Sequence, residues 1–272
     1  MRLAAALLAL LLSATQVGGT EDAALRGLDT GDDGRGWEAV GRINIGRTGF
    51  CTGTLISPTL VLTAAHCLYD EVSGAPIPVA KFQFLAGWRN GAAVAYRDVR
   101  RAVAHPAYEF RGTSGQIAVV NDVALLELDR PIRTTAIRPF ATGARPRKGD
   151  PVGVVSYAHD RDDKPSLQEV CHVLARRSGS LILSCSVDFG SSGAPIFVTE
   201  DGEPRIVSVV SAKAEVRGRK VSLGTALEEP LEELRAALAA GDGVFTRAAP
   251  EVQTMSLDAA RVRQGGAKFV RP

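Results

Sequence analysis

The stretch Leu62-Thr63-Ala64-Ala65-His66-Cys67 closes an apolar run and leaves a histidine beside a cysteine. Residues 60–63 are apolar or β-branched, which predicts a strand that ends just before the histidine. Taken alone, this histidine fits two roles equally well, that of a catalytic base and that of a core histidine with satisfied hydrogen bonds. Two further stretches of the sequence decide between these roles.

The two further stretches supply an acid and a serine, in that order along the chain. Asn121-Asp122-Val123-Ala124-Leu125-Leu126-Glu127-Leu128 places an acid at the start of an apolar strand, where it can be buried against a cationic group. Gly190-Ser191-Ser192-Gly193-Ala194-Pro195 predicts a tight turn, whose glycines let the backbone approach a ligand closely. Hydrolysis of a peptide bond without a metal needs a nucleophile, a base, a group that orients the base and donors for the oxyanion. The three stretches offer a candidate for each part.

Short β-like runs separated by turn residues fill most of the chain and fall into two groups of six. This spacing predicts an all-β architecture with two barrels. The first group covers residues 40–45, 53–56, 60–63, 81–86, 93–104 and 123–128, and the second covers 151–157, 168–175, 180–185, 194–198, 205–212 and 221–226.

The beginning of the chain has the pattern of an export signal. Arg2 precedes an apolar run over residues 3–12, and small or polar residues follow it. This run is shorter than the roughly 20 residues that a membrane-spanning helix needs. We therefore expect a cleaved signal and a secreted or periplasmic protein without a stable membrane anchor; a retained helix or a wrongly assigned start is the alternative.

A helical period appears near the end of the chain, where four leucines from Leu227 to Leu238 share one face. We expect this helix to pack on the second barrel. The residues beyond it have few apolar side chains and end in a basic run, which is typical of a solvated tail or of a segment that binds a partner. The expected parts are a signal over residues 1–19, a flexible leader over 20–36, a domain over 37–240 with barrels at about 37–144 and 150–226 and a helix at 227–240, and a tail over 241–272.

The three chemical stretches, in the order His, Asp, Ser, resemble the signature blocks of the trypsin and chymotrypsin family of serine endopeptidases. Phe50-Cys51-Thr52-Gly53-Thr54-Leu55-Ile56 is similar to the strand before the family's histidine, and His105-Pro106-Ala107-Tyr108 to the loop before its aspartate. The resemblance implies two six-stranded antiparallel β-barrels with a C-terminal helix. It also implies a protein or peptide substrate.

By the same resemblance, each candidate residue has an expected role in an acyl-enzyme mechanism. Ser192 is the nucleophile, His66 is the general base, and Asp122 orients His66. The backbone N–H groups of Gly190 and Ser192 form the oxyanion hole.

The four cysteines are expected to form disulfides, because their number is even and the chain is exported. The family has a bridge at the place of Cys51 and Cys67. The remaining pair, Cys171 and Cys185, flanks a second expected hairpin that ends before the Ser192 turn. Three pairings are formally possible, and this one is our prediction.

The sequence departs from the digestive members of the family at two places. Ser191 stands where those members carry an aspartate that pairs with a newly freed N-terminus, so the chain is more similar to bacterial or glutamyl-type members. Ser186 stands where trypsin-like enzymes carry the aspartate that binds Lys or Arg. The expected pocket accepts an apolar residue, or an acidic one if Lys213 attracts it rather than being a plain surface lysine. Its walls are expected to be Ser186, Val187, Phe189, Ser211, Lys213 and Gly224.

Other classes of function find less support in the sequence. The net charge is +2 and the basic residues are dispersed, which does not favour nucleic acid as a partner. Pairs and clusters typical of metal sites are missing, and we expect no metal or cofactor. The acidic run 160–163 lacks the ordered spacing of a calcium loop. We expect a monomer, and the rival hypothesis is a non-catalytic homologue that acts as a binding or regulatory module.

Overall fold

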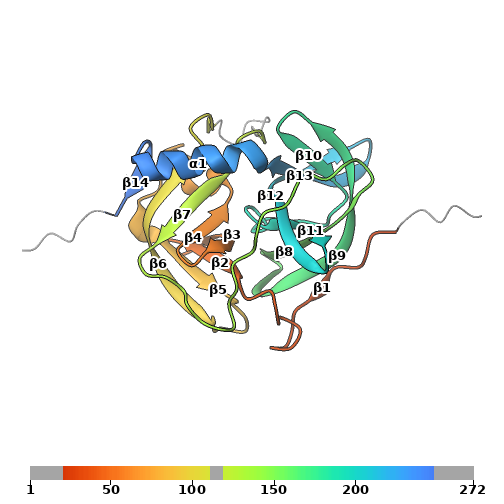
Figure 1. Ribbon diagram of the computed structural model, residues 1–272, viewed down its shortest axis with the longest axis horizontal. Coiled ribbons are helices and arrows are strands. Elements are labelled where there is room, and N and C mark those ends of the chain that lie inside the picture. The colour runs from red at the N-terminus through yellow and green to blue at the C-terminus, as the bar shows by residue number, and fades with distance from the viewer. Residues whose placement is uncertain (1–20, 111–118, 248–272) are drawn as a thin grey trace, which may run out of the picture.

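The computed structural model describes residues 21–110 and 119–247, so the expected signal over 1–19 and residues 248–272 of the expected tail lie outside the described residues. The described strands form two sheets that lie side by side, and an α-helix follows them near the C-terminal end (Figure 1). Each sheet contains seven described strands, six of which close into a barrel.

The first barrel closes because β6 pairs with β5 on one side and with β7 on the other, in the ring β6-β5-β2-β3-β4-β7. The short strand β14 (Val244–Thr246) adds to the outside of β6. The ring strands are β2 (Val40–Ile45), β3 (Gly49–Ser57), β4 (Leu60–Thr63), β5 (Phe82–Ala86), β6 (Ala95–Ala104) and β7 (Ala124–Leu128).

The second barrel closes through the pairing of β8 with β9, in the ring β9-β10-β13-β12-β11-β8. The strand β1 (Arg26–Gly27) adds to the outside of β9. All twelve expected β-runs overlap a ring strand, so the predicted pair of six-stranded antiparallel barrels is confirmed. The ring strands are β8 (Pro151–Ala158), β9 (Arg161–Arg177), β10 (Ser180–Leu183), β11 (Pro195–Glu200), β12 (Glu203–Val216) and β13 (Arg219–Ala226).

An aromatic cluster joins the two barrels. The ring of Phe197 on β11 of the second barrel lies 4.8 Å from that of Phe140 in the connection between the barrels. The ring of Trp37, just before the first barrel, lies 5.1 Å from that of Phe197. Because these apolar rings are removed from water together, the cluster favours one arrangement of the barrels. The site described below depends on that arrangement.

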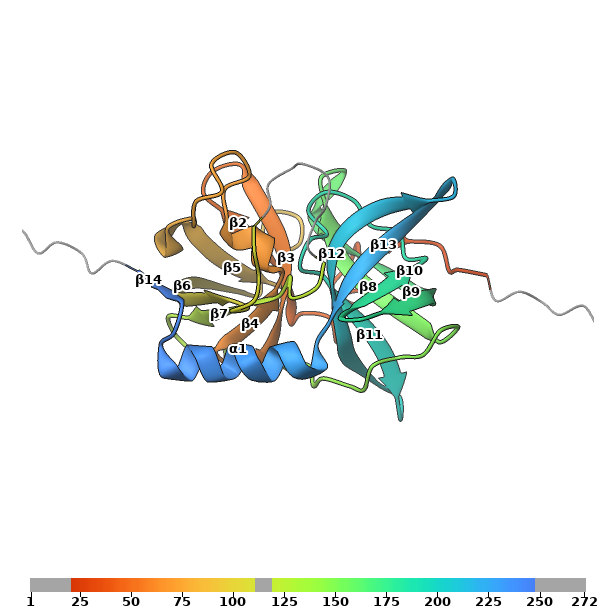
Figure 2. The same cartoon turned by 90° about the horizontal axis from the view of Figure 1, so that it is seen from above.

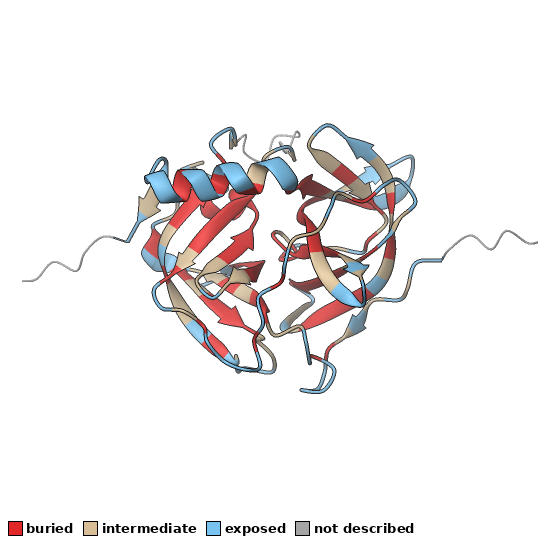
Figure 3. Ribbon diagram, in the orientation of Figure 1, coloured by how far each residue is buried: buried red, intermediate tan, exposed pale blue. Residues whose placement is uncertain are grey.

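The helix α1 (Glu228–Ala240) forms where the leucine period predicts it, but it covers the first barrel. It contacts β6 and β7, and Leu231, Leu234 and Leu238 are buried against that side (Figures 2 and 3). The expectation that it packs on the second barrel is therefore wrong. The leucine period marks the buried face of a helix but does not say which neighbour that face meets.

The segments expected to be a flexible leader and a solvated tail contain packed residues within the described part of the chain. In the leader, β1 pairs with β9 and Leu28 is fully buried. In the first residues of the tail, β14 pairs with β6. Among the described residues, no helix is long and apolar enough to cross a membrane.

Both expected disulfides are present, Cys51–Cys67 in the first barrel and Cys171–Cys185 in the second. Replacing Cys171 and Cys185 together by serine opens a loop of 14 residues. We expect the free energy of unfolding to fall by about 3 kcal/mol, because the unfolded chain gains loop entropy. Urea unfolding with and without the substitutions measures the change, and an unchanged midpoint would contradict it.

Candidate active site

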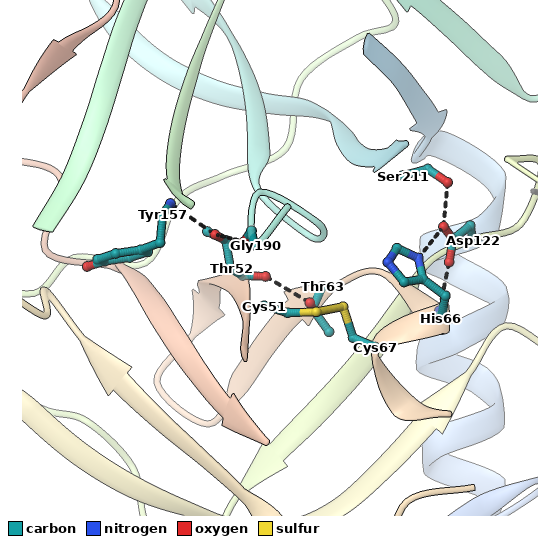
Figure 4. Close-up of a disulfide and its surroundings, with 9 residues drawn as sticks. All are labelled: Cys51, Thr52, Thr63, His66, Cys67, Asp122, Tyr157, Gly190 and Ser211. Carbon is teal, nitrogen blue, oxygen red and sulfur yellow. Dashed lines mark hydrogen bonds and ion pairs between the residues drawn. A yellow bond between two sulfur atoms is a disulfide. The ribbon is translucent and has the colours of Figure 1, made fainter. Parts of the chain in front are cut away.

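His66 lies at the edge of the first barrel in a short 3-10 helix, Ala65–Leu68, that directly follows β4. The next residue, Cys67, is bonded to Cys51 on β3. The disulfide therefore ties the helix that carries His66 to the barrel wall (Figure 4). The side chain of His66 remains 24% exposed, which leaves part of the ring accessible.

Asp122 is fully buried just before β7, and its carboxylate receives three hydrogen bonds. Oδ1 accepts the backbone N–H of His66 at 2.9 Å, and Oδ2 lies 2.7 Å from His66 Nδ1. The third donor is the hydroxyl of Ser211 on β12, which belongs to the second barrel (Figure 4). Ser211 is expected from the sequence to line a pocket wall, whereas its hydroxyl donates to Asp122 Oδ2.

The contact with Asp122 fixes the tautomer of His66. An ionised carboxylate only accepts hydrogen bonds, so Nδ1 must carry the proton. The lone pair of the neutral ring then lies on Nε2, the nitrogen that can accept a proton. Burial lowers the pKa of His66, but the negative charge of Asp122 and its hydrogen bond outweigh burial, so the pKa lies above its ordinary value.

The Ser192 turn belongs to the second barrel, yet the first barrel holds it. The carbonyl of Ser192 accepts the N–H of Thr52 on β3 at 2.9 Å, and the carbonyl of Gly190 accepts the hydroxyl of Thr52 at 2.9 Å. Gly193 has φ +80°, and a Cβ there would lie 2.1 Å from Thr63 Oγ1. The turn is therefore pressed against the end of β4, three residues before His66.

The turn also leaves two backbone donors available. Within the described residues, neither the N–H of Gly190 nor that of Ser192 donates to a protein acceptor. Gly190 has φ +93°, a conformation that glycine adopts readily. Two N–H groups of one turn without a protein acceptor can bind an oxyanion.

The side chain of Ser191 belongs to a buried network of neutral hydrogen bonds. Its hydroxyl is fully buried, 3.1 Å from the carbonyl oxygen of Tyr157 and 3.2 Å from Ser156 Oγ. The hydroxyl also accepts the N–H of Asp188 at 3.3 Å. The position that carries an aspartate in digestive relatives is therefore satisfied here without a charge.

The segment before the turn and the strand β12 hold most of the expected pocket residues. Lys213 on β12 pairs with Asp188, with Nζ 2.6 Å from Oδ1. The same Nζ lies 3.9 Å from the ring centre of Phe189, which is 67% exposed. Lys213 therefore has a carboxylate and an aromatic partner, and its charge is largely balanced.

The remaining pocket candidates lie in different settings. Ser186 is exposed and Val187 half-buried, and the N–H of Ser186 donates to Gln168 Oε1 at 2.7 Å. Gly224 is buried, and a Cβ there would lie 2.4 Å from Ser208 Oγ, so close packing requires this glycine. Ser222, opposite Lys213 in the sheet, has a buried hydroxyl without a hydrogen-bond partner among the described residues. Sequence reasoning missed Ser222, because its register against Lys213 is a property of the folded sheet.

The other histidines have partners away from the Ser192 turn or a packing role. Nε2 of His105 lies 3.1 Å from the Glu233 carboxylate, and burial lowers the pKa of His105. His159 stacks on Phe50, with ring centres 5.1 Å apart. These contacts give His105 and His159 packing roles.

A group of potential metal ligands lies beside the site. Donor atoms of Cys51, His66 and Cys67 lie within 4.8 Å of one another. Cysteine binds metals as a thiolate, and both sulfur atoms are joined in the disulfide. The group is therefore a histidine next to a disulfide rather than a metal site.

A sequence profile of the trypsin family, described as Trypsin, matches residues 30–221. The chain belongs to the trypsin family. Among curated relatives, it is 38% identical over 97 residues to a Modular serine protease of Drosophila melanogaster, covering 33% of this chain and 15% of the relative. It is 36% identical over 94 residues to a Trypsin of Phaedon cochleariae, covering 33% and 32%. It is 28% identical over 165 residues to Serine protease 23 of Mus musculus, covering 54% and 43%.

The matched region spans less than half the length of each of these three trypsin-family relatives. A solved structure of a Glu endopeptidase in complex with MPD superposes with a TM-score of 0.65 and 18% identity, covering 81% of this chain and 98% of that one. At this identity the likeness concerns the fold, which is chymotrypsin-like.

The contact between Asp122 and His66 generates a pH prediction. Replacing Asp122 by asparagine removes the negative charge that raises the pKa of His66, so this pKa should fall. An NMR titration of the His66 ring in the two proteins measures the shift. A pKa of His66 that stays the same or rises in Asp122→Asn would contradict the assignment.

Proposed function

We propose that this trypsin-family chain is a secreted or periplasmic serine endopeptidase that cleaves protein or peptide substrates through an acyl-enzyme on Ser192. The observation that carries the proposal is the pairing of His66 Nδ1 with the buried Asp122 at 2.7 Å, beside a turn that the first barrel holds in place. This pairing is the arrangement that a general base needs. The two disulfides support an oxidising compartment.

In the proposed reaction, His66 Nε2 takes the proton of Ser192 Oγ as the oxygen attacks the substrate carbonyl carbon. The N–H groups of Gly190 and Ser192 stabilise the negative oxygen of the tetrahedral intermediate. His66 then gives its proton to the leaving amine, which separates from the acyl group. A water molecule then attacks the acyl-enzyme in the same way, with His66 as the base, and the acid product leaves Ser192. Asp122 stabilises the charged ring of His66 through both steps.

For the substrate pocket, we propose the walls Ser186, Val187 and Phe189 on one side and Lys213 on the other. Because Asp188 balances the charge of Lys213, an acidic side chain would meet an ion pair rather than a free cation. The proposed preference is therefore for an uncharged residue, which differs from the Glu endopeptidase of similar fold.

The nucleophile can be tested with a fluorophosphonate probe on the oxidised protein without residues 1–19. We expect the parent to be labelled and Ser192→Ala not to be labelled, with hydrolysis lowered by about 10⁶-fold because the triad acts as a unit. The matched control is Ser191→Ala, which stays labelled because its hydroxyl faces Ser156 and Tyr157. A parent that takes no label would overturn the proposal and favour a non-catalytic homologue.

The proposed pocket can be tested by removing the carboxylate that pairs with Lys213. In Asp188→Asn, we expect kcat/KM for a peptide with Glu before the cleaved bond to rise roughly 5-fold relative to one with Leu, because Lys213 becomes available to the substrate carboxylate. Adding Lys213→Ala should abolish that gain. Hydrolysis of the two matched peptides by the three proteins gives the ratio, and an equal gain without Lys213 would sink the idea.

A further inference from the structure

Residues 22–28, called the strap below, lie along the outside of the second barrel. The strap runs antiparallel to β9 and forms β1 within it (Figure 1). The N–H of Ala23 donates to the carbonyl of Val170 at 2.7 Å, and the N–H of Leu28 donates to that of Pro165 at 2.9 Å. Leu28 is fully buried, so the far end of the strap is anchored in apolar surroundings.

One side chain links the strap to the segment that leads into the Ser192 turn. Gln168 on β9 is only 4% exposed and uses both ends of its amide. Its Nε2 donates to the carbonyl of Ala23 at 2.9 Å, and its Oε1 accepts the N–H of Ser186 at 2.7 Å. A buried amide with two such partners holds both in place, because leaving either unpaired is costly. Ser186 lies six residues before Ser192.

A second link runs from Asp22, two residues into the described chain. Its Oδ1 accepts the hydroxyl of Ser184 at 2.7 Å and lies 2.8 Å from His172 Nδ1. The hydroxyl of Ser184 in turn accepts the N–H of His172 at 2.9 Å. Residues 184 and 186 are thus both tied to the strap, on either side of the disulfide-bonded Cys185.

We propose that the strap is a positioning element for the pocket wall at residues 184–186, acting through Gln168 and Ser184; this inference rests on the proposed function. β10 ends at Leu183, and the N–H of Ser186 finds its acceptor in a side chain instead of a neighbouring strand. Ser191 is neutral and cannot make the ion pair expected at this position in digestive members, and the strap supports the wall instead.

The strap thereby has a specific effect on substrate binding. It fixes the wall that contacts a substrate side chain, while the oxyanion donors and His66 are held by Thr52, Thr63 and Asp122. Loosening the strap should raise KM for peptides, with little change in the reactivity of Ser192 toward a small probe. A role limited to overall stability would instead lower kcat and labelling in proportion to the unfolded fraction and leave KM unchanged.

The test compares Gln168→Ala and Asp22→Ala with the control Arg26→Ala. The control breaks an exposed ion pair between the strap and Glu169, which has no part in the links to Ser184 and Ser186. We expect KM for a peptide substrate to rise about tenfold in the first two variants, with kcat and the rate of fluorophosphonate labelling within about threefold of the parent. Arg26→Ala should match the parent in all three quantities.

Amide hydrogen exchange over residues 184–190 tests the link between the strap and the pocket wall without depending on catalysis. We expect faster exchange there in Gln168→Ala and Asp22→Ala, but not in Arg26→Ala. Unchanged exchange and unchanged KM in both variants would overturn the strap's role, and so would losses of kcat and labelling with KM unchanged. Failure of the parent to label would instead overturn the proposed function, while the exchange result would still report whether the strap holds the wall. Asp22→Ala keeps the test decisive if Gln168→Ala does not fold, since Asp22 is partly exposed.

Discussion

The buried carboxylate of Asp122 is the constraint on which the rest of the site depends. A buried charge that water cannot reach must be compensated by hydrogen bonds, and removing one of its partners strongly destabilises the fold. Its donors come from the backbone and ring of His66 in the first barrel and from Ser211 in the second. The need to satisfy one carboxylate therefore fixes the imidazole and joins the two barrels at the same point.

The second constraint is steric and acts on the Ser192 turn. Because a Cβ at Gly193 would meet Thr63, the turn approaches the end of β4 more closely than any other residue type permits. Hydrogen bonds from Thr52 to the carbonyls of Ser192 and Gly190 hold it at that distance. The Ser192 turn of the second barrel is thus held against the strand that leads to His66 in the first barrel.

Local patterns in the sequence predict the elements well and their partners poorly. Short β-like runs separated by turn residues located the twelve barrel strands, because strands and the turns that end them differ in composition along the chain. The barrel on which α1 packs and the pairing of Lys213 with Asp188 depend on residues distant in sequence. The register of Ser222 against Lys213 depends on where the hairpin of β12 and β13 turns. The segment 20–36 was expected to be flexible, since a strand of two residues at β1 is too short to leave a periodic signal.

The polar network behind the site is mostly neutral, which affects how the proposed enzyme becomes competent. An ion pair between a freed N-terminus and an acid would make order depend on a cleavage event and on charge. Ser191 and Gln168 use hydroxyl and amide groups instead, and these groups stay neutral over the range in which histidine titrates. The turn and its preceding wall can therefore be ordered in the chain as it folds. The buried charge of the site belongs to Asp122, which pairs with His66.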